Sequence, residues 1–88
     1  MARYRALIKS SAVKELEDLL RKDRRRIVER IRVLGAAPRP PGTVKLAGGE
    51  KYRLRQGPYR IVYSISNPEQ VLLVVKVGHR REVYRSDD

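Results

Sequence analysis

The chain has 88 residues, a mass of 10.2 kDa, and 21 Lys and Arg residues against 10 Asp and Glu, which gives a net charge of +11. A chain of this length forms one domain, residues 1–88, with no room for separate cofactor and substrate domains. Cysteine is absent, which excludes disulfides, zinc thiolates and cysteine nucleophiles. The longest apolar run, Val71 to Val75, is far shorter than the roughly 20 residues of a membrane helix. Because the first residues also lack an apolar signal-peptide region, we expect a small cytoplasmic protein with no membrane partner.

The positive charge is concentrated in the middle of the chain. Residues 1–34 carry 11 basic and 5 acidic side chains, residues 35–60 carry 6 and 1, and residues 61–88 carry 4 and 4. A basic stretch with almost no counter-charge indicates a polyanionic partner, either nucleic acid or an acidic protein. The mixed signs of the first third are typical of a solvated helix, and Arg24 to Arg26 fit a solvated helix start as well as an RNA contact.

The first half of the chain predicts one strand and two helices. Partial alternation and β-favouring side chains predict a strand over residues 3–8. A first helix follows, with Ser10 or Ser11 as its N-cap and an apolar face made of Val13, Leu16 and Leu20. Asp23 is a candidate N-cap for a second helix, which ends at Gly35 and has an apolar face made of Ile27, Ile31 and Leu34. We expect the two helices to form an antiparallel hairpin.

From residue 43 the hydrophobic period changes to two, which is typical of strands. We expect a short strand over 43–47 and further strands near 52–55, 59–66 and 71–77, with a short terminal piece at 83–85. Tyr52 and Leu54 should face one side of the sheet, with Arg53 and Arg55 on the solvent side. The nearly continuous apolar run at 71–77 suits a central strand covered on both faces. The predicted fold is therefore α+β: an N-terminal strand and a helical hairpin packed on a small, mainly antiparallel sheet of about four strands.

Three stretches of sequence together form a distinctive pattern. They are Lys45-Leu46, the run YRLRQGPYRIVY from Tyr52 to Tyr63, and the run VGHRREVY from Val77 to Tyr84. In this order, and over essentially the whole chain, they closely resemble the RelE branch of the RelE/ParE toxin superfamily.

The resemblance implies the toxin of a type II toxin–antitoxin system. Such a toxin is an endoribonuclease (an mRNA interferase) that depends on the ribosome, cleaves mRNA in the A site of the 30S subunit and inhibits translation. The implied partners are the ribosome with its mRNA, a cognate antitoxin that neutralises the toxin, and operator DNA only as a toxin–antitoxin complex.

The implied reaction is attack of a ribose 2′-OH on the adjacent phosphate, with departure of the 5′-oxygen. It requires removal of the 2′-OH proton, stabilisation of the charged phosphorane and protonation of the leaving oxygen. Cationic side chains can supply that stabilisation, so we expect no cofactor and no metal. The sequence has one His and no Asp and His cluster at metal-ligand spacing, which is consistent with this expectation.

The resemblance also implies roles for individual residues. Arg53 and Arg55 match a pair of basic residues on one strand face, and Arg60 matches an arginine that contacts the scissile phosphate. Arg80 matches an arginine that acts as acid or charge stabiliser, and Tyr84 matches a tyrosine that stacks on an mRNA base. His79 lies beside Arg80 and completes the candidate catalytic set. Further RNA-binding candidates are Lys45, Lys51 and Arg81.

One departure from the family pattern concerns the general base. Where relatives often have lysine, this chain has Arg53 and Arg55, and a guanidinium that stays protonated is a poor proton acceptor but a good phosphate clamp. His79 is the only histidine, the residue type best suited to proton transfer near neutral pH. We expect His79 to share the acid–base work with Glu50, Lys51 or a ribosomal group.

Each assignment has a purely structural alternative. Arg53 and Arg55 fit a solvated strand face, and Arg60 fits a surface salt-bridge partner. His79 fits an ordinary turn residue, and Tyr84 fits a core aromatic. Three other tyrosines are interpreted as packing residues: Tyr4, Tyr52 and Tyr63.

Two other functions are compatible with the same fold. One is a ParE-like inhibitor of DNA gyrase, although such chains generally lack the clustered arginines and the tyrosine near the C-terminus. The other is a catalytically inactive relic that only binds antitoxin or DNA. The arginines in place of lysine keep this second alternative open.

Overall fold

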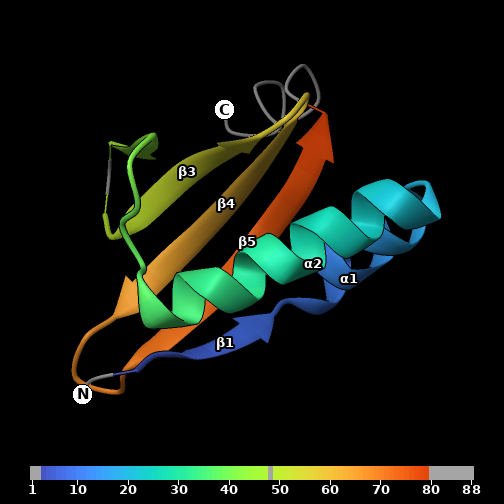
Figure 1. The fold of residues 1–88 in the computed structure, drawn as a ribbon. Helices are drawn as coiled ribbons and strands as arrows, with labels where there is room; N and C mark the ends of the chain where they lie inside the picture. The colour runs from blue at the N-terminus through green and yellow to red at the C-terminus, as the bar shows by residue number, and fades with distance from the viewer. Residues whose placement is uncertain (1–2, 48, 80–88) are drawn as a thin grey trace.

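A computed structural model of the chain describes residues 3–47 and 49–79. Its five strands form one sheet in the order β1-β5-β4-β3-β2, and two helices lie against it (Figure 1). The predicted α+β class is confirmed, with five strands in place of about four. The predicted terminal piece at 83–85 lies outside the described residues. The elements are β1 (Arg5–Ile8), α1 (Ser10–Glu17), α2 (Arg21–Ala36), β2 (Thr43–Lys45), β3 (Lys51–Gln56), β4 (Tyr59–Ser66) and β5 (Val71–His79).

The sheet combines antiparallel and parallel pairing. The pairs β2–β3, β3–β4 and β4–β5 are antiparallel, as expected for strands joined by short turns. Gly57 in the β3–β4 turn has a φ of 60°, a conformation that glycine adopts without steric penalty. The N-terminal strand β1, whose neighbour the sequence left open, pairs in parallel with β5 from Arg5–Val71 to Ile8–Val74.

Both helices cover the same face of the sheet, which we call the helix face, and the chain reverses direction between them (Figure 1). The predicted apolar face of the second helix is confirmed, since Ile27, Ile31 and Leu34 are all buried. No helix among the described residues is long and apolar enough to cross a membrane. Under the helices lies a core made of Ala12, Leu16, Ile27, Ile31, Leu34, Tyr52, Leu54, Ile61, Tyr63, Ile65, Leu72, Val74 and Val77.

The predicted buried face of α1 was partly wrong. Leu16 is buried, but Val13 is exposed and Leu20, at 71% exposure, lies beyond the helix end. The second buried residue is Ala12, whose small side chain allows α1 to lie close to β5. The N-cap is Lys9, with no side-chain cap hydrogen bond, so the predicted serine cap was also wrong.

Both predicted boundaries of α2 were wrong, and both residues that predicted them make tertiary contacts. Asp23 lies inside the first turn, and its carboxylate accepts a hydrogen bond from the Tyr59 hydroxyl at 3.0 Å. Gly35 is a buried helical residue because the chain before β1 passes very close to it. Tyr4 N–H donates to the Gly35 carbonyl at 2.8 Å, and a Cβ at position 35 would lie 2.9 Å from the Tyr4 carbonyl oxygen.

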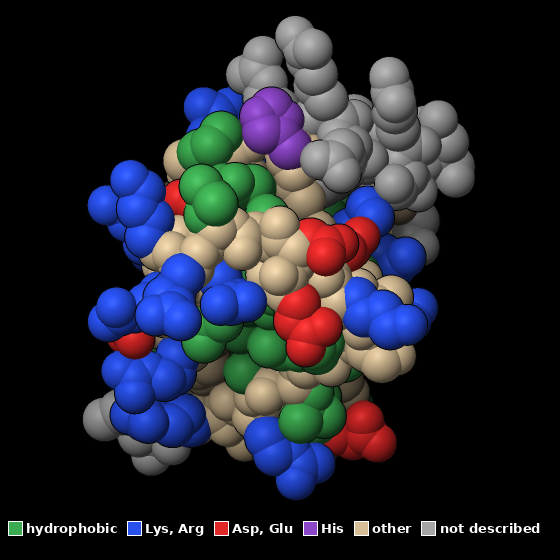
Figure 2. Space-filling view, turned by 90° about the vertical axis from the view of Figure 1, so that its right-hand side faces the viewer, with side chains coloured by type: hydrophobic (Ala, Val, Ile, Leu, Met, Phe, Trp, Pro, Cys, Tyr) green, Lys and Arg blue, Asp and Glu red, His purple; other side chains and the backbone are tan. Residues whose placement is uncertain are grey.

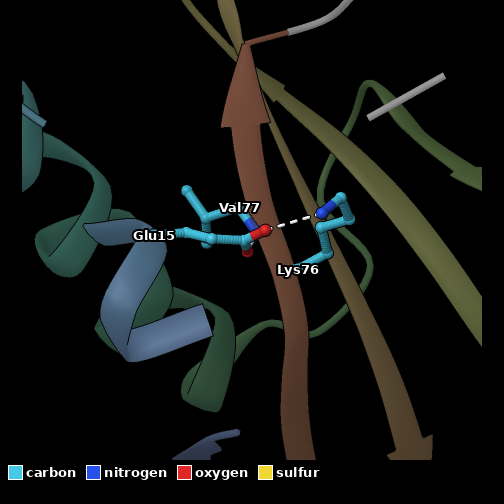
Figure 3. A network of polar contacts seen from close by, with 3 residues as sticks. All are labelled: Glu15, Lys76 and Val77. Atoms are coloured by element: carbon cyan, nitrogen blue, oxygen red, sulfur yellow. Dashed lines mark hydrogen bonds and ion pairs between the residues drawn. The ribbon is translucent and has the colours of Figure 1, made fainter. Parts of the chain in front are cut away.

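The edge of β5 that extends beyond β1 is protected by a side chain. The ladder between β1 and β5 ends at Val74, so the Val77 N–H has no strand partner on that side. Instead, the Glu15 carboxylate on α1 accepts the Val77 N–H at 2.9 Å and the Lys76 ammonium at 2.6 Å (Figure 3). Glu15 therefore joins α1 to β5 and satisfies a backbone donor at a sheet edge.

Candidate active site

Three candidate arginines lie on the face of the sheet opposite the helices, which we call the arginine face. On β3, Tyr52 and Leu54 are buried on the helix face, so Arg53 and Arg55 point the other way, as the alternation predicts. Arg55 is the direct cross-strand partner of Arg60 on β4, which places their side chains on the same face. The structure therefore brings Arg53, Arg55 and Arg60 together on two adjacent strands.

The arginine face is more enclosed than the sequence suggests. Arg55 is exposed, but Arg53 is half-buried and Arg60 is only 4% exposed. Val62, two residues along β4 on the same face, is also buried and is not part of the core under the helices. The structural alternative for Arg60 was a salt-bridge partner at the surface. Its burial shows that Arg60 is not a surface residue.

Lys51 extends the arginine row. It begins β3, two residues before Arg53, and its alternation places it on the arginine face with an exposed side chain. The other two candidates near this turn lie elsewhere. Lys45 on β2 pairs with Tyr52 on the helix face, and its ammonium is 3.8 Å from the Glu50 carboxylate. Glu50 also accepts the Tyr52 hydroxyl at 3.3 Å.

His79 is not brought together with the arginines. It pairs with Tyr59 across β4 and β5, and the two rings meet edge to face at 6.1 Å between centroids. Because the Tyr59 hydroxyl donates to Asp23 on α2, both rings belong to the helix face. Arg60, one residue along β4, pairs instead with Gly78.

The reason for this placement is a β-bulge in β5. Val62 pairs with Lys76 and Tyr63 pairs with Val74, so Val75 has no partner of its own. The extra residue reverses the alternation, and the side chains that follow it change faces. Without the bulge, His79 would lie on the arginine face.

Some predicted site residues lie outside the described residues: Arg80, Arg81 and Tyr84.

Of the tyrosines interpreted as packing residues, Tyr52 and Tyr63 are buried and stacked, with 5.8 Å between their ring centroids. The Arg39 guanidinium lies 5.5 Å from the Tyr52 ring centroid. Tyr4 is half-buried, and its hydroxyl donates to Asn67. Burial raises the pKa of the Tyr63 hydroxyl, which donates to the Pro38 carbonyl at 2.6 Å.

A second group of basic residues was only partly identified from the sequence. Lys22, Arg25, Arg26 and Arg30 line a hollow beside α2, on the helix face. The run Arg24 to Arg26 was a candidate RNA contact from the sequence, whereas Lys22 and Arg30 were not identified. Their i,i+4 spacing with Arg26 places all three on one stripe of the helix, and this spacing is the signal that could have found them.

Comparison with known proteins identifies the family. Residues 6–84 match the family model described as the ParE toxin of the type II toxin–antitoxin system parDE. The chain belongs to the RelE/ParE superfamily of type II toxins. A comparison with curated proteins finds no match.

Solved structures of RelE toxins share the fold of this toxin. A chain of the archaeal RelE–RelB complex from Pyrococcus horikoshii OT3 is 32% identical, with a TM-score of 0.79 and coverage of 91% of this chain and 97% of that chain. The isolated RelE toxin of E. coli is 27% identical, with a TM-score of 0.75 and coverage of 96% and 94%. In the RelB–RelE complex from Methanococcus jannaschii the match is 24% identical, with a TM-score of 0.73 and coverage of 91% and 96%, and shows the fold alone.

Proposed function

We propose that this toxin is a ribosome-dependent mRNA endonuclease of the RelE branch, which cleaves in the A site and inhibits translation. The observation that carries the proposal is the cross-strand pair of Arg55 and Arg60, flanked on the same face by Arg53 and Lys51. Guanidinium groups bind phosphate oxygens through paired hydrogen bonds, so this row suits an RNA backbone and the charge of a phosphorane.

Two of the three requirements of the reaction, the base and the stabilisation of charge, then have a candidate group on this face. The 2′-oxygen attacks the adjacent phosphorus while its proton passes to a general base, for which Lys51 is the candidate on this face. Arg55 and Arg60 stabilise the negative charge of the phosphorane. The bond from phosphorus to the 5′-oxygen breaks as that oxygen takes up a proton from a general acid. Arg80 as acid or charge stabiliser and Tyr84 as the base-stacking residue remain predictions.

Lys51 is preferred as the base on positional grounds. Lysine is able to act as a general base, whereas arginine stays protonated. Of the named alternatives, Glu50 is turned toward Lys45 and Tyr52 on the helix face, and His79 contacts Tyr59 on that face. Lys51 is the candidate that shares a face with the arginines.

We also propose that a cognate antitoxin neutralises the toxin. Similar toxins from Pyrococcus horikoshii and Methanococcus jannaschii were solved as complexes with RelB. The net charge of +11 favours an acidic partner electrostatically. The ribosome and mRNA would be the other partners of the toxin, and operator DNA a partner only of the toxin–antitoxin complex.

The test is primer extension on a defined mRNA in a purified translation reaction, with and without ribosomes. The wild-type toxin should produce new 3′ ends only with ribosomes. Arg55→Ala should reduce cleavage about 100- to 1000-fold, the usual effect of removing one charge-stabilising donor. Arg21→Ala is the matched control, because Arg21 is exposed on α2, away from the arginine face. Equal cleavage by both variants would refute the assignment of the arginine face.

A second candidate function is inhibition of DNA gyrase. It is favoured by one observation, the match of residues 6–84 to the ParE toxin model. The same purified toxin should then leave mRNA intact and inhibit supercoiling by gyrase. A folded toxin with neither activity would correspond to the inactive relic.

A further inference from the structure

The hollow beside α2 is strongly basic and lies on the helix face, opposite the arginine face. Its volume is about 630 Å³, and the described residues that line it include four cations and one carboxylate. That carboxylate, Glu29, is already paired with Arg32 at 3.1 Å. Figure 2 shows that Lys and Arg side chains gather along one flank of the molecule. The lining residues are Lys22, Arg25, Arg26, Glu29, Arg30 and Val33 on α2, with Gln56 on β3.

The four cations of the hollow have no acidic partner within the described part of the chain. The ion pairs there join Arg32 to Glu29, Lys45 to Glu50 and Lys76 to Glu15. In addition, the Nε of Arg30 is buried and has no hydrogen-bond acceptor in that part of the chain. A buried donor without a partner is unfavourable, and the arginine that carries it is one of the residues that line the hollow.

The spacing of these cations also opposes helix stability. Lys22, Arg26 and Arg30 follow one another at i,i+4 positions, where like charges repel. They lie about 6 Å apart along the helix axis, since each residue rises 1.5 Å. A regular row of cations at this spacing is suited to a polyanion with regularly spaced charges, and the fold itself gains nothing from it.

The lining of the hollow distinguishes between kinds of RNA. Proteins that hold single-stranded RNA combine cations with aromatic rings on which bases stack. Within residues 3–47 and 49–79, no aromatic side chain lines the hollow. Double-helical RNA keeps its bases stacked inside and presents phosphates and 2′-hydroxyl groups, which proteins recognise by shape and charge.

We propose that the hollow binds the phosphate backbone of double-helical RNA, through Lys22, Arg25, Arg26 and Arg30. This inference rests on the proposed function for its biological meaning, because a toxin that acts on the ribosome must contact structured RNA. One face of the sheet then holds the strand to be cut, and the helix on the other face holds a duplex. An acidic protein segment in the hollow is the competing occupant.

The test measures binding without cleavage. Fluorescence anisotropy follows a labelled RNA hairpin of about 16 base pairs and a single strand of about 12 nucleotides over a range of KCl concentrations. The variant is Arg25→Gln with Arg26→Gln, both exposed, and the control is Lys14→Gln with Arg21→Gln, also exposed and equal in net charge. Equal melting temperatures would establish that both variants fold.

The hollow variant should bind the hairpin about tenfold more weakly, and its slope of log K against log salt should fall by about 2, or roughly one per lost phosphate contact. In the control variant, the hairpin affinity and the salt slope should both stay close to the wild-type values. Equal losses in the two variants, or equal losses for hairpin and single strand, would overturn the proposal. So would unchanged RNA binding together with weaker binding of poly-glutamate, the probe for an acidic protein.

Failure of this proposal is distinguishable from failure of the proposed function. Arg55→Ala should lose cleavage and keep hairpin binding, since Arg55 lies on the arginine face. If the toxin never cleaves mRNA but the hollow variant still binds the hairpin more weakly than the control does, the duplex-binding proposal stands and the nuclease proposal is refuted.

Discussion

Removal of the Glu15 carboxylate should be among the most destabilising single changes at the surface of this protein. The carboxylate accepts the N–H of Val77, a residue that is 1% exposed, and the ammonium of Lys76. In Glu15→Ala the Val77 N–H loses its acceptor, which costs about 1–3 kcal/mol. The ion pair, whose side chains are 23% and 30% exposed, adds about 0.5 kcal/mol. We therefore expect a loss of about 2 kcal/mol, which lowers the melting temperature by about 10 °C in a domain of this size.

Two further variants separate the terms of this prediction. Glu15→Gln keeps a carbonyl oxygen for the Val77 N–H and loses only the ion pair, so it should cost about 0.5 kcal/mol. Glu17→Ala makes the same truncation at an exposed position on the same helix and should have almost no effect. Urea and thermal unfolding followed by circular dichroism measure all three. If Glu15→Gln lowers the free energy of unfolding as much as Glu15→Ala does, the Val77 N–H is not the important partner. If Glu15→Ala and Glu17→Ala lower it equally, the Glu15 carboxylate has no stabilising role and the prediction is refuted.

Three other variants test separate parts of the structure. Gly35→Ala should lower the free energy of unfolding by about 1–3 kcal/mol, because its Cβ would lie 2.9 Å from the Tyr4 carbonyl oxygen; an unchanged melting temperature would contradict this close approach. Burial raises the pKa of Tyr63, so its neutral hydroxyl contributes stability that is complete below about pH 10 and is lost as the pH rises further. The stability difference between wild type and Tyr63→Phe should therefore shrink above pH 10 in urea titrations, and a constant difference would refute it. Arg55→Lys keeps the charge but not the paired hydrogen bonds, so primer extension should show cleavage between that of wild type and Arg55→Ala.

The local patterns of the sequence predicted the antiparallel strands and the apolar face of α2 well, although not the ends of that helix. Alternation separated Tyr52 and Leu54 from Arg53 and Arg55, and the structure has the first pair buried and the second pair on the other face. These predictions succeed because burial on one face of a strand imposes a period of two on neighbouring residues. No long-range information is needed for them.

The failures concern contacts between distant segments. Gly35 is typical of a helix end, yet it lies within α2 because the backbone at Tyr4 requires a residue without a Cβ. Asp23 is typical of an N-cap, yet it serves as the acceptor for Tyr59, 36 residues away. In both cases the residue type correctly indicated a specific structural role. The partner that determines this role lies far away in the sequence, so local patterns do not identify it.

The composition of the candidate site depends on one residue that the sequence does not mark. Strict alternation from Leu72 and Val74 would turn His79 toward the arginine face and would favour it as the base. The unpaired Val75 reverses that order, so His79 meets Tyr59 on the helix face. Lys51, on a strand without an irregularity, keeps the face that alternation gives it. A bulge of one apolar residue within an apolar run leaves no signal in hydropathy, and it separates His79 on β5 from the face on which we propose that Lys51 acts as the base.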